Sequence, residues 1–158
     1  MKVYCPLLLS GKYFANKHAS KGLPGGQNVS PLIQWGDVPQ GVGSFALSMI
    51  DRLSSSKEWV HWYVINIPAS FREIPERASG NRDKMPRGSL ELRNSFGDLG
   101  YGGPEPPKNS PSCVCEITVH ALSVAALPVG PFSTPEECAE EMRGRLIGGA
   151  TMTAIFRR

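Results

Sequence analysis

Residues that could bind a small anion lie at three places along the chain. Asp51 ends an apolar stretch, His61 stands between Trp59 and Trp62, and residues 98–104 are rich in glycine. A glycine-rich loop lets backbone N–H groups approach a ligand closely, and successive N–H groups can form a nest for phosphate. A histidine adds a donor and, when protonated, a positive charge. The residue types therefore suit an anion.

Asp51 and His61 are expected to be neighbours, because the end of one antiparallel strand lies beside the start of the next. A carboxylate there would fix the tautomer of the imidazole and favour its charged form, or hold an amine. The alternative is structural, since a histidine next to an aspartate often only supports a fold, and Trp59 and Trp62 suit a core. From these residues alone the sequence predicts a β-rich domain with a candidate anion site.

The four cysteines are Cys5, Cys113, Cys115 and Cys138. Only Cys113 and Cys115 are close in sequence, and their spacing differs from the C-x-x-C of zinc and redox motifs. We therefore expect ordinary strand thiols, with no metal and no cofactor. A second interpretation stays open: a Cys113 thiol beside a protonated imidazole would have a lowered pKa and would be reactive.

Four segments have the pattern of β-strands. The first is apolar on both faces, as in a strand that is covered on both sides. The third alternates strictly, which places Cys113, Cys115, Ile117 and Val119 on one face. The second ends at a proline, which cannot donate to a neighbouring strand. The segments are 44–51, 59–67, 113–122 and 150–156.

One helix is predicted after Thr134. Thr134 is a good N-cap, Pro135 suits the first helical position, and Glu137 completes a capping box. Apolar residues then recur every four positions as far as Leu146, which gives a stripe for packing on a sheet. We expect Gly148–Gly149 to end the helix.

Two stretches, 21–31 and 93–112, are rich in glycine and proline. Loops of this length in a compact domain usually bind a ligand or are disordered. The second stretch contains Phe96 and Tyr101, which disordered segments disfavour. We therefore expect 93–112 to be an ordered functional loop.

Composition limits the classes of function. A chain of 158 residues suits one domain. The net charge is +3, but no basic stripe interleaves with aromatic residues, so no nucleic acid is expected as a partner. The N-terminal apolar run is too short for a signal peptide, and no stretch approaches the ~20 apolar residues of a transmembrane segment. The expected location is cytoplasmic.

Four sets of residues follow one another over residues 14–156. They are Asn28–Trp35 with Val38–Gly41, Ser44–Leu47 leading to Asp51, Glu58–Trp62 with Asn66–Pro68, and Arg93–Gly97 with Gly100–Pro107. Together they resemble the motifs of the phosphatidylethanolamine-binding protein (PEBP), or Raf kinase inhibitor-like, family in its bacterial and archaeal branch.

The resemblance implies a mainly β, PEBP-like fold, in which a large antiparallel sheet packs on a smaller sheet with short peripheral helices. It implies a single domain over residues 1–158, a small surface pocket for phosphate or phosphorylethanolamine-like groups, and a homodimer. The residues that fall on ligand-binding positions are Asp51, Trp59, His61, Tyr101, Gly103, Cys113 and Cys115.

The chain departs from the family's pattern at two places. Where the family usually has Asp-Pro-Asp-x-Pro, Asp51 is kept but Leu53 replaces the second aspartate. Where the family usually has His-Arg-Tyr, this chain has Cys113 and Cys115 around Val114. A thiol is a weak donor, so we expect weaker phosphate binding than in relatives, or a retuned pocket.

The leading hypothesis is non-catalytic binding of a small anion or a phospholipid head group. The alternative, which the resemblance also implies, is a modulator that inhibits a kinase or a serine protease through surface loops. A thiol-dependent activity at Cys113 ranks third. We expect no enzyme, because the G-x-S-x-G elbow is absent, and Ser54–Ser56 with an Asp/His pair is a common coincidence.

Overall fold

A computed structural model describes residues 1–52, 58–109 and 112–158, so Leu53 and Ser54–Ser56 lie outside the described residues. The described part has eight β-strands, one α-helix and one 3-10 helix, Asn16–His18. The strands are β1 (Lys2–Tyr4), β2 (Ile33–Gly36), β3 (Ser44–Asp51), β4 (Trp59–Pro68), β5 (Glu73–Ile74), β6 (Leu90–Glu91), β7 (Cys113–Leu122) and β8 (Leu146–Phe156), and α1 is Pro135–Met142.

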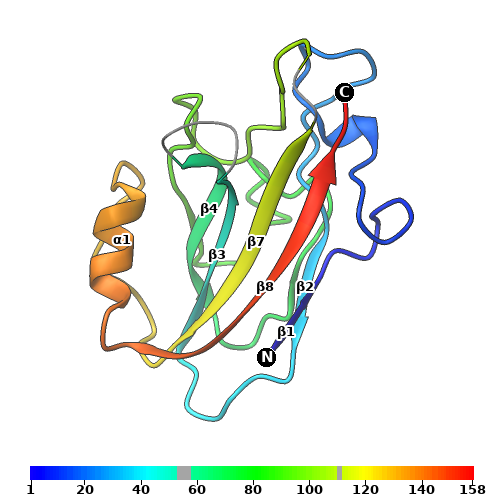
Figure 1. Ribbon diagram of the computed structural model, residues 1–158. Coiled ribbons are helices and arrows are strands. Elements are labelled where there is room, and N and C mark those ends of the chain that lie inside the picture. The colour runs from blue at the N-terminus through cyan, green and yellow to red at the C-terminus, as the bar shows by residue number, and fades with distance from the viewer. Residues whose placement is uncertain (53–57, 110–111) are drawn as a thin grey trace.

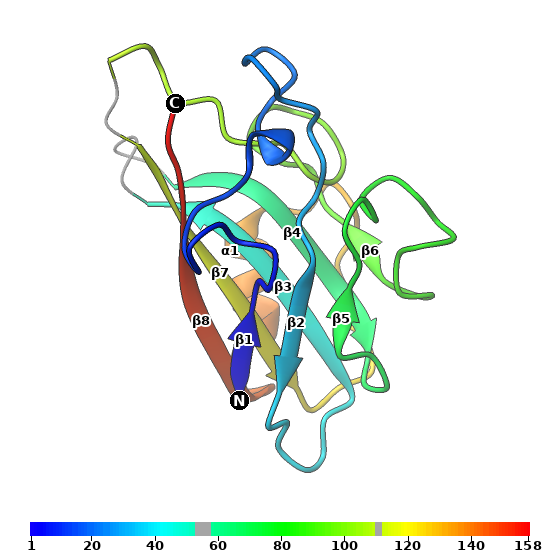
Figure 2. The ribbon, with the colours of Figure 1, turned by 90° about the vertical axis from the view of Figure 1, so that its right-hand side faces the viewer.

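The strands form two antiparallel sheets. The large sheet has five strands in the order β6-β4-β3-β7-β8, and the small sheet has three in the order β1-β2-β5. Figure 2 shows the small sheet in front of the large one, with α1 behind it. The predicted mainly β fold, with a large sheet packed on a smaller one, is confirmed.

Strand β3 lies in the middle of the large sheet and is buried along its whole length. The small sheet covers one of its faces and α1 the other (Figure 1). Strand β3 is therefore apolar on both faces because both faces are covered, as predicted. Strand β7, beside it, alternates between buried and half-buried residues, and Cys113, Cys115, Ile117 and Val119 all belong to the core between the sheets.

The helix begins as predicted but ends earlier. The capping box forms, because the Glu137 N–H donates to Thr134 Oγ1 and the Thr134 N–H donates to the Glu137 carboxylate. The helix stops at Met142, and Gly144 with φ of 75° turns the chain. The prediction of a helix as far as Gly148–Gly149 is wrong, because both glycines and Leu146 belong to β8.

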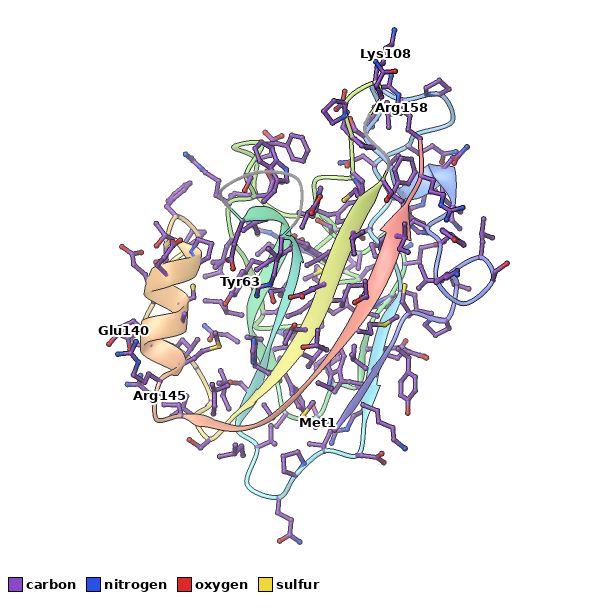
Figure 3. All side chains as sticks on the ribbon, in the orientation of Figure 1. Met1, Tyr63, Lys108, Glu140, Arg145 and Arg158 are labelled. Carbon is purple, nitrogen blue, oxygen red and sulfur yellow. The ribbon has the colours of Figure 1, made fainter. Side chains whose placement is uncertain are left out.

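The helix packs on the outer face of the large sheet. Its buried residues, Cys138 and Met142, join a second apolar cluster with Val60 and Tyr63 of β4. Figure 3 shows Tyr63 in the space between the sheet and α1. Burial raises the pKa of Tyr63, in keeping with this position.

The predicted site residues gather at one end of the large sheet. Strands β3 and β8 end there, and β4 and β7 begin there (Figure 1). Lys108 and Arg158 lie at the same end (Figure 3), where Arg158 donates to the Pro106 carbonyl over 3.1 Å. No helix in the described part of the chain is long and apolar enough to cross a membrane.

Candidate functional site

His61 occupies a β-bulge at the start of β4. Trp62 pairs with Met49 and Val60 pairs with Ile50, so His61 is an extra residue on β4 without a pairing partner in β3. Val60 faces α1 and Trp62 faces the core between the sheets. A bulge can redirect a side chain. This one allows His61 to point towards Cys113 on the inner side.

A fixed hydrogen bond orients the His61 ring. Its Nδ1 lies 2.8 Å from the carbonyl oxygen of Gly102. Because a carbonyl oxygen only accepts, Nδ1 carries the proton, and Nε2 of the neutral ring is left with a lone pair. From the sequence we expected Asp51 to fix the tautomer of His61. The structure shows that the Gly102 carbonyl fixes the proton at Nδ1.

Cys113 and Cys115 lie against His61. Cys113 Sγ is 3.6 Å from His61 Nε2 and 3.2 Å from Cys115 Sγ. All three side chains are buried, with exposed fractions of 3% for His61, 4% for Cys113 and 0% for Cys115. The imidazole that the second interpretation placed beside the Cys113 thiol is therefore that of His61, which is remote from both cysteines only in sequence.

The pKa of the Cys113 thiol is raised, which disfavours the reactive thiolate. The hydrogen bond to Cys115 and then burial raise the pKa of the thiol well above its ordinary value, while His61 lowers it by a smaller amount. The interpretation of Cys113 as a low-pKa thiol is thus contradicted. A thiol of this kind remains protonated at neutral pH and is a poor nucleophile.

The backbone N–H groups of Gly102 and Gly103, in the glycine-rich loop, are already bonded within the chain. The Gly102 N–H donates to the His61 carbonyl over 2.8 Å, and the Gly103 N–H donates to Asn28 Oδ1 over 2.6 Å. The expectation that these two N–H groups form a free anion nest is wrong. Their glycines serve close packing: a Cβ on Gly103 would lie 2.4 Å from the His18 carbonyl oxygen.

Asn28 joins the two turn-rich stretches. Besides accepting from Gly103, its side-chain amide donates to the Tyr101 carbonyl over 3.2 Å. Asn94 holds the second stretch from within, because its side chain donates to the Gly100 carbonyl and accepts from the N–H groups of Phe96 and Asp98. Sequence reasoning missed both roles, although an asparagine beside glycines is a typical sign of side-chain-to-backbone bonding.

A cavity of about 220 Å³ lies at this junction. It is smaller than the roughly 300–1,000 Å³ of sites for drug-sized ligands, so its size suits a small group. Gly102 connects it to the His61 cluster, because the Gly102 carbonyl binds His61. Its lining residues are Ser20, Lys21, Asn28, Phe96, Asp98, Tyr101, Gly102 and Gly103.

The other predicted site residues take separate positions. Asp51 is buried and lies in register between Trp59 of β4 and Cys115 of β7. Half-buried Trp59 contacts Phe96 edge-on, with ring centroids 5.2 Å apart. The hydroxyl of Tyr101 donates to the His18 carbonyl over 2.7 Å, and burial raises the pKa of this hydroxyl.

The cavity is lined by two of the predicted site residues, Tyr101 and Gly103. The other five do not border it; they are Asp51, Trp59, His61, Cys113 and Cys115.

Comparison with known proteins identifies relatives over nearly the whole chain. A family model described as phosphatidylethanolamine-binding protein matches residues 8–157. The UPF0098 protein YbhB of Escherichia coli is 32% identical over 99% of both chains. The UPF0098 protein YbcL of the same organism is 33% identical over 93% of this chain and 82% of its own.

Solved structures show the same fold. The crystal structure of E. coli YbcL, described as a new member of the mammalian PEBP family, has a TM-score of 0.89 at 31% identity, and the match covers 99% of this chain and 98% of that one. The PEBP homologue CT736 of Chlamydia trachomatis has a TM-score of 0.83 at 22% identity, over 99% and 97%. At that identity the second likeness concerns the fold alone.

Proposed function

The chain belongs to the phosphatidylethanolamine-binding protein family, and from that premise we propose that it binds a small zwitterionic phosphate group, such as a phosphorylethanolamine head group, without catalysis. The observation that carries the proposal is the charge pattern of the 220 Å³ cavity. Lys21 offers one cation and Asp98 one anion, beside the neutral hydroxyl of Ser20.

The two charges are available to a ligand. Neither Lys21 nor Asp98 takes part in an ion pair within the described residues. An anion alone would be attracted by Lys21 and repelled by Asp98. A phosphate that carries an ammonium group can satisfy both, with phosphate at Lys21 and ammonium at Asp98.

His61 takes an indirect part in this proposal. Its bond to the Gly102 carbonyl holds one wall of the cavity.

We include a cytoplasmic location in the proposal, because the four cysteines are buried and free, as suits a reducing compartment.

Isothermal titration at low ionic strength, where surface charges are least screened, tests the proposal. Phosphorylethanolamine and inorganic phosphate are titrated into the wild type, Lys21→Ala and Asp98→Asn, with exposed Lys84→Ala as the matched control. We expect Lys21→Ala to weaken both ligands and Asp98→Asn to weaken phosphorylethanolamine only. His61→Ala should weaken both by loosening Gly102.

Two outcomes would overturn the proposal. The first is the absence of saturable binding of phosphorylethanolamine by the wild type at millimolar concentration. The second is an affinity of Asp98→Asn for phosphorylethanolamine equal to that of the wild type. It would mean that Asp98 does not recognise the ammonium group.

A further inference from the structure

We propose that His61, Cys113 and Cys115 form a binding site for one zinc ion. Their ligand atoms all lie within 4.8 Å of one another, and all three side chains are buried. Within the described residues this is the only group of three or more His, Cys, Asp or Glu side chains that approach so closely. The inference does not rest on head-group binding, because none of the three side chains lines the cavity and His61 reaches it only through the Gly102 carbonyl.

The His61 ring is prepared for a metal by its outer hydrogen bond. Histidine ligands commonly donate the second ring N–H to a backbone carbonyl, which fixes the tautomer and directs the other nitrogen at the ion. His61 has this arrangement, with Nδ1 bonded to the Gly102 carbonyl at 2.8 Å and Nε2 facing Cys113. The bulge in β4 supplies the direction of the side chain.

The distances require only small movements. Zinc bonds of about 2.3 Å to sulfur and about 2.0–2.1 Å to nitrogen place the ligand atoms of a tetrahedral site roughly 3.6–3.8 Å apart. Cys113 Sγ and His61 Nε2 are already 3.6 Å apart, and the two sulfurs at 3.2 Å need to separate slightly. Cys115 Sγ and Nε2, within 4.8 Å, need to approach each other by at most about 1.2 Å. Rotation of the thiol side chains can provide both changes.

The chemistry of the ligands selects zinc over hard ions. Thiolate and imidazole prefer zinc, whereas magnesium and calcium prefer oxygen. Two thiolates and a neutral imidazole balance the charge of Zn²⁺, which matters in a buried site. Each thiol loses its proton to solvent as its Zn–S bond forms, so binding releases two protons. The fourth position is left for water or a small anion, because no fourth side chain of these types joins the group among the described residues.

Zinc titration of the fully reduced, metal-free protein tests the site. Affinity is measured by competition with a chromophoric chelator, and bound zinc is counted by elemental analysis. We expect one ion per chain for the wild type. Cys113→Ser, Cys115→Ser and His61→Gln should each weaken binding by more than the roughly 10–100-fold that loss of an outer partner costs. Cys138→Ser, at a buried cysteine packed under α1, is the control and should bind as the wild type does.

Cobalt on the wild type gives a readout that does not depend on the folding of any variant. A tetrahedral Co²⁺ complex with two thiolates should show sulfur-to-metal charge-transfer absorption, and zinc should displace it. Absence of that absorption, absence of stoichiometric zinc, or loss of zinc in Cys138→Ser would each overturn the proposal. Titration without phosphorylethanolamine separates this result from that for the cavity.

Discussion

His61 and Gly102 are joined by two hydrogen bonds of equal length. The imidazole Nδ1 donates to the Gly102 carbonyl over 2.8 Å, and the Gly102 N–H donates to the His61 carbonyl over 2.8 Å. The first residue of this pair lies in the bulge of β4, and the second lies in the glycine-rich loop. The pair therefore ties the loop to the sheet at the candidate site.

Alanine at the loop glycines should destabilise the protein in a defined order. A Cβ on Gly103 would lie 2.4 Å from the backbone oxygen of His18, which cannot easily yield. A Cβ on Gly102 would meet the ring of Phe96 at 2.5 Å, and a side chain can move more easily. Such overpacking costs about 1–3 kcal/mol, so we expect Gly103→Ala at the upper end and Gly102→Ala at the lower end in urea unfolding.

Gly130→Ala is the control for both variants. A Cβ there meets no atom within 4 Å, and the residue has no left-handed φ. Its free energy of unfolding should stay equal to that of the wild type or rise by about 0.4–1 kcal/mol, because the unfolded chain loses freedom. A smaller loss for Gly103→Ala than for Gly102→Ala would contradict the packing described.

Asn94→Ala should loosen the glycine-rich loop. The buried side chain makes hydrogen bonds to Phe96, Asp98 and Gly100, and its removal leaves backbone groups without partners. We expect a loss of about 1–3 kcal/mol in the free energy of unfolding and faster hydrogen exchange over residues 95–102. Exposed Asn81→Ala, which removes one side-chain bond to the Asp83 N–H, should cost less. Equal losses for the two variants would show that the Asn94 bonds do not hold the loop.

The sequence contained enough information for the strands that build the site. Alternation at period two fixed which face of β7 carries Cys113 and Cys115, and burial of every residue of β3 agrees with its apolar pattern on both faces. The helix end was missed because Leu146 continues the four-residue spacing of α1. The signal that decides the end is Gly144, whose positive φ turns the chain towards β8.

The convergence of His61 with the two thiols was expected from the resemblance, which places all three at ligand-binding positions, and not from their spacing in the sequence. His61 is 52 residues from Cys113, and the bulge that turns it inwards leaves no mark on a pattern of alternating residues. The fate of the glycine N–H groups was equally hidden. Their acceptors, Asn28 and His61, come from distant segments that meet only in the folded chain.

Thr134→Ala should destabilise α1 through loss of its capping box. The Glu137 N–H donates to Thr134 Oγ1 over 3.1 Å, and alanine cannot accept this bond. Loss of an N-cap costs about 0.5–2 kcal/mol, which urea unfolding can detect. Thr134→Ser keeps the hydroxyl and should match the wild type. A stability of Thr134→Ser equal to that of the alanine variant would mean that the cap bond contributes nothing.

Stability should fall in mild acid partly because of His18. Its buried ring donates from Nδ1 to the Val29 carbonyl over 2.7 Å, and burial lowers its pKa below the ordinary 6.5. The unfolded chain therefore binds a proton at a higher pH than the folded chain does. The contribution to stability is complete above about pH 6.5 and is lost as the pH falls from there towards the folded pKa.

His18→Gln isolates this contribution, because glutamine is a polar side chain of similar length that does not titrate. The free energy of unfolding, measured in urea from pH 7.5 to pH 5, should decline less steeply for His18→Gln than for the wild type. Gly130→Ala, which changes no titrating group, should shift the curve without changing its slope. Equal slopes for the wild type and His18→Gln would mean that the folded and unfolded chains protonate His18 alike, against the lowering of its pKa by burial.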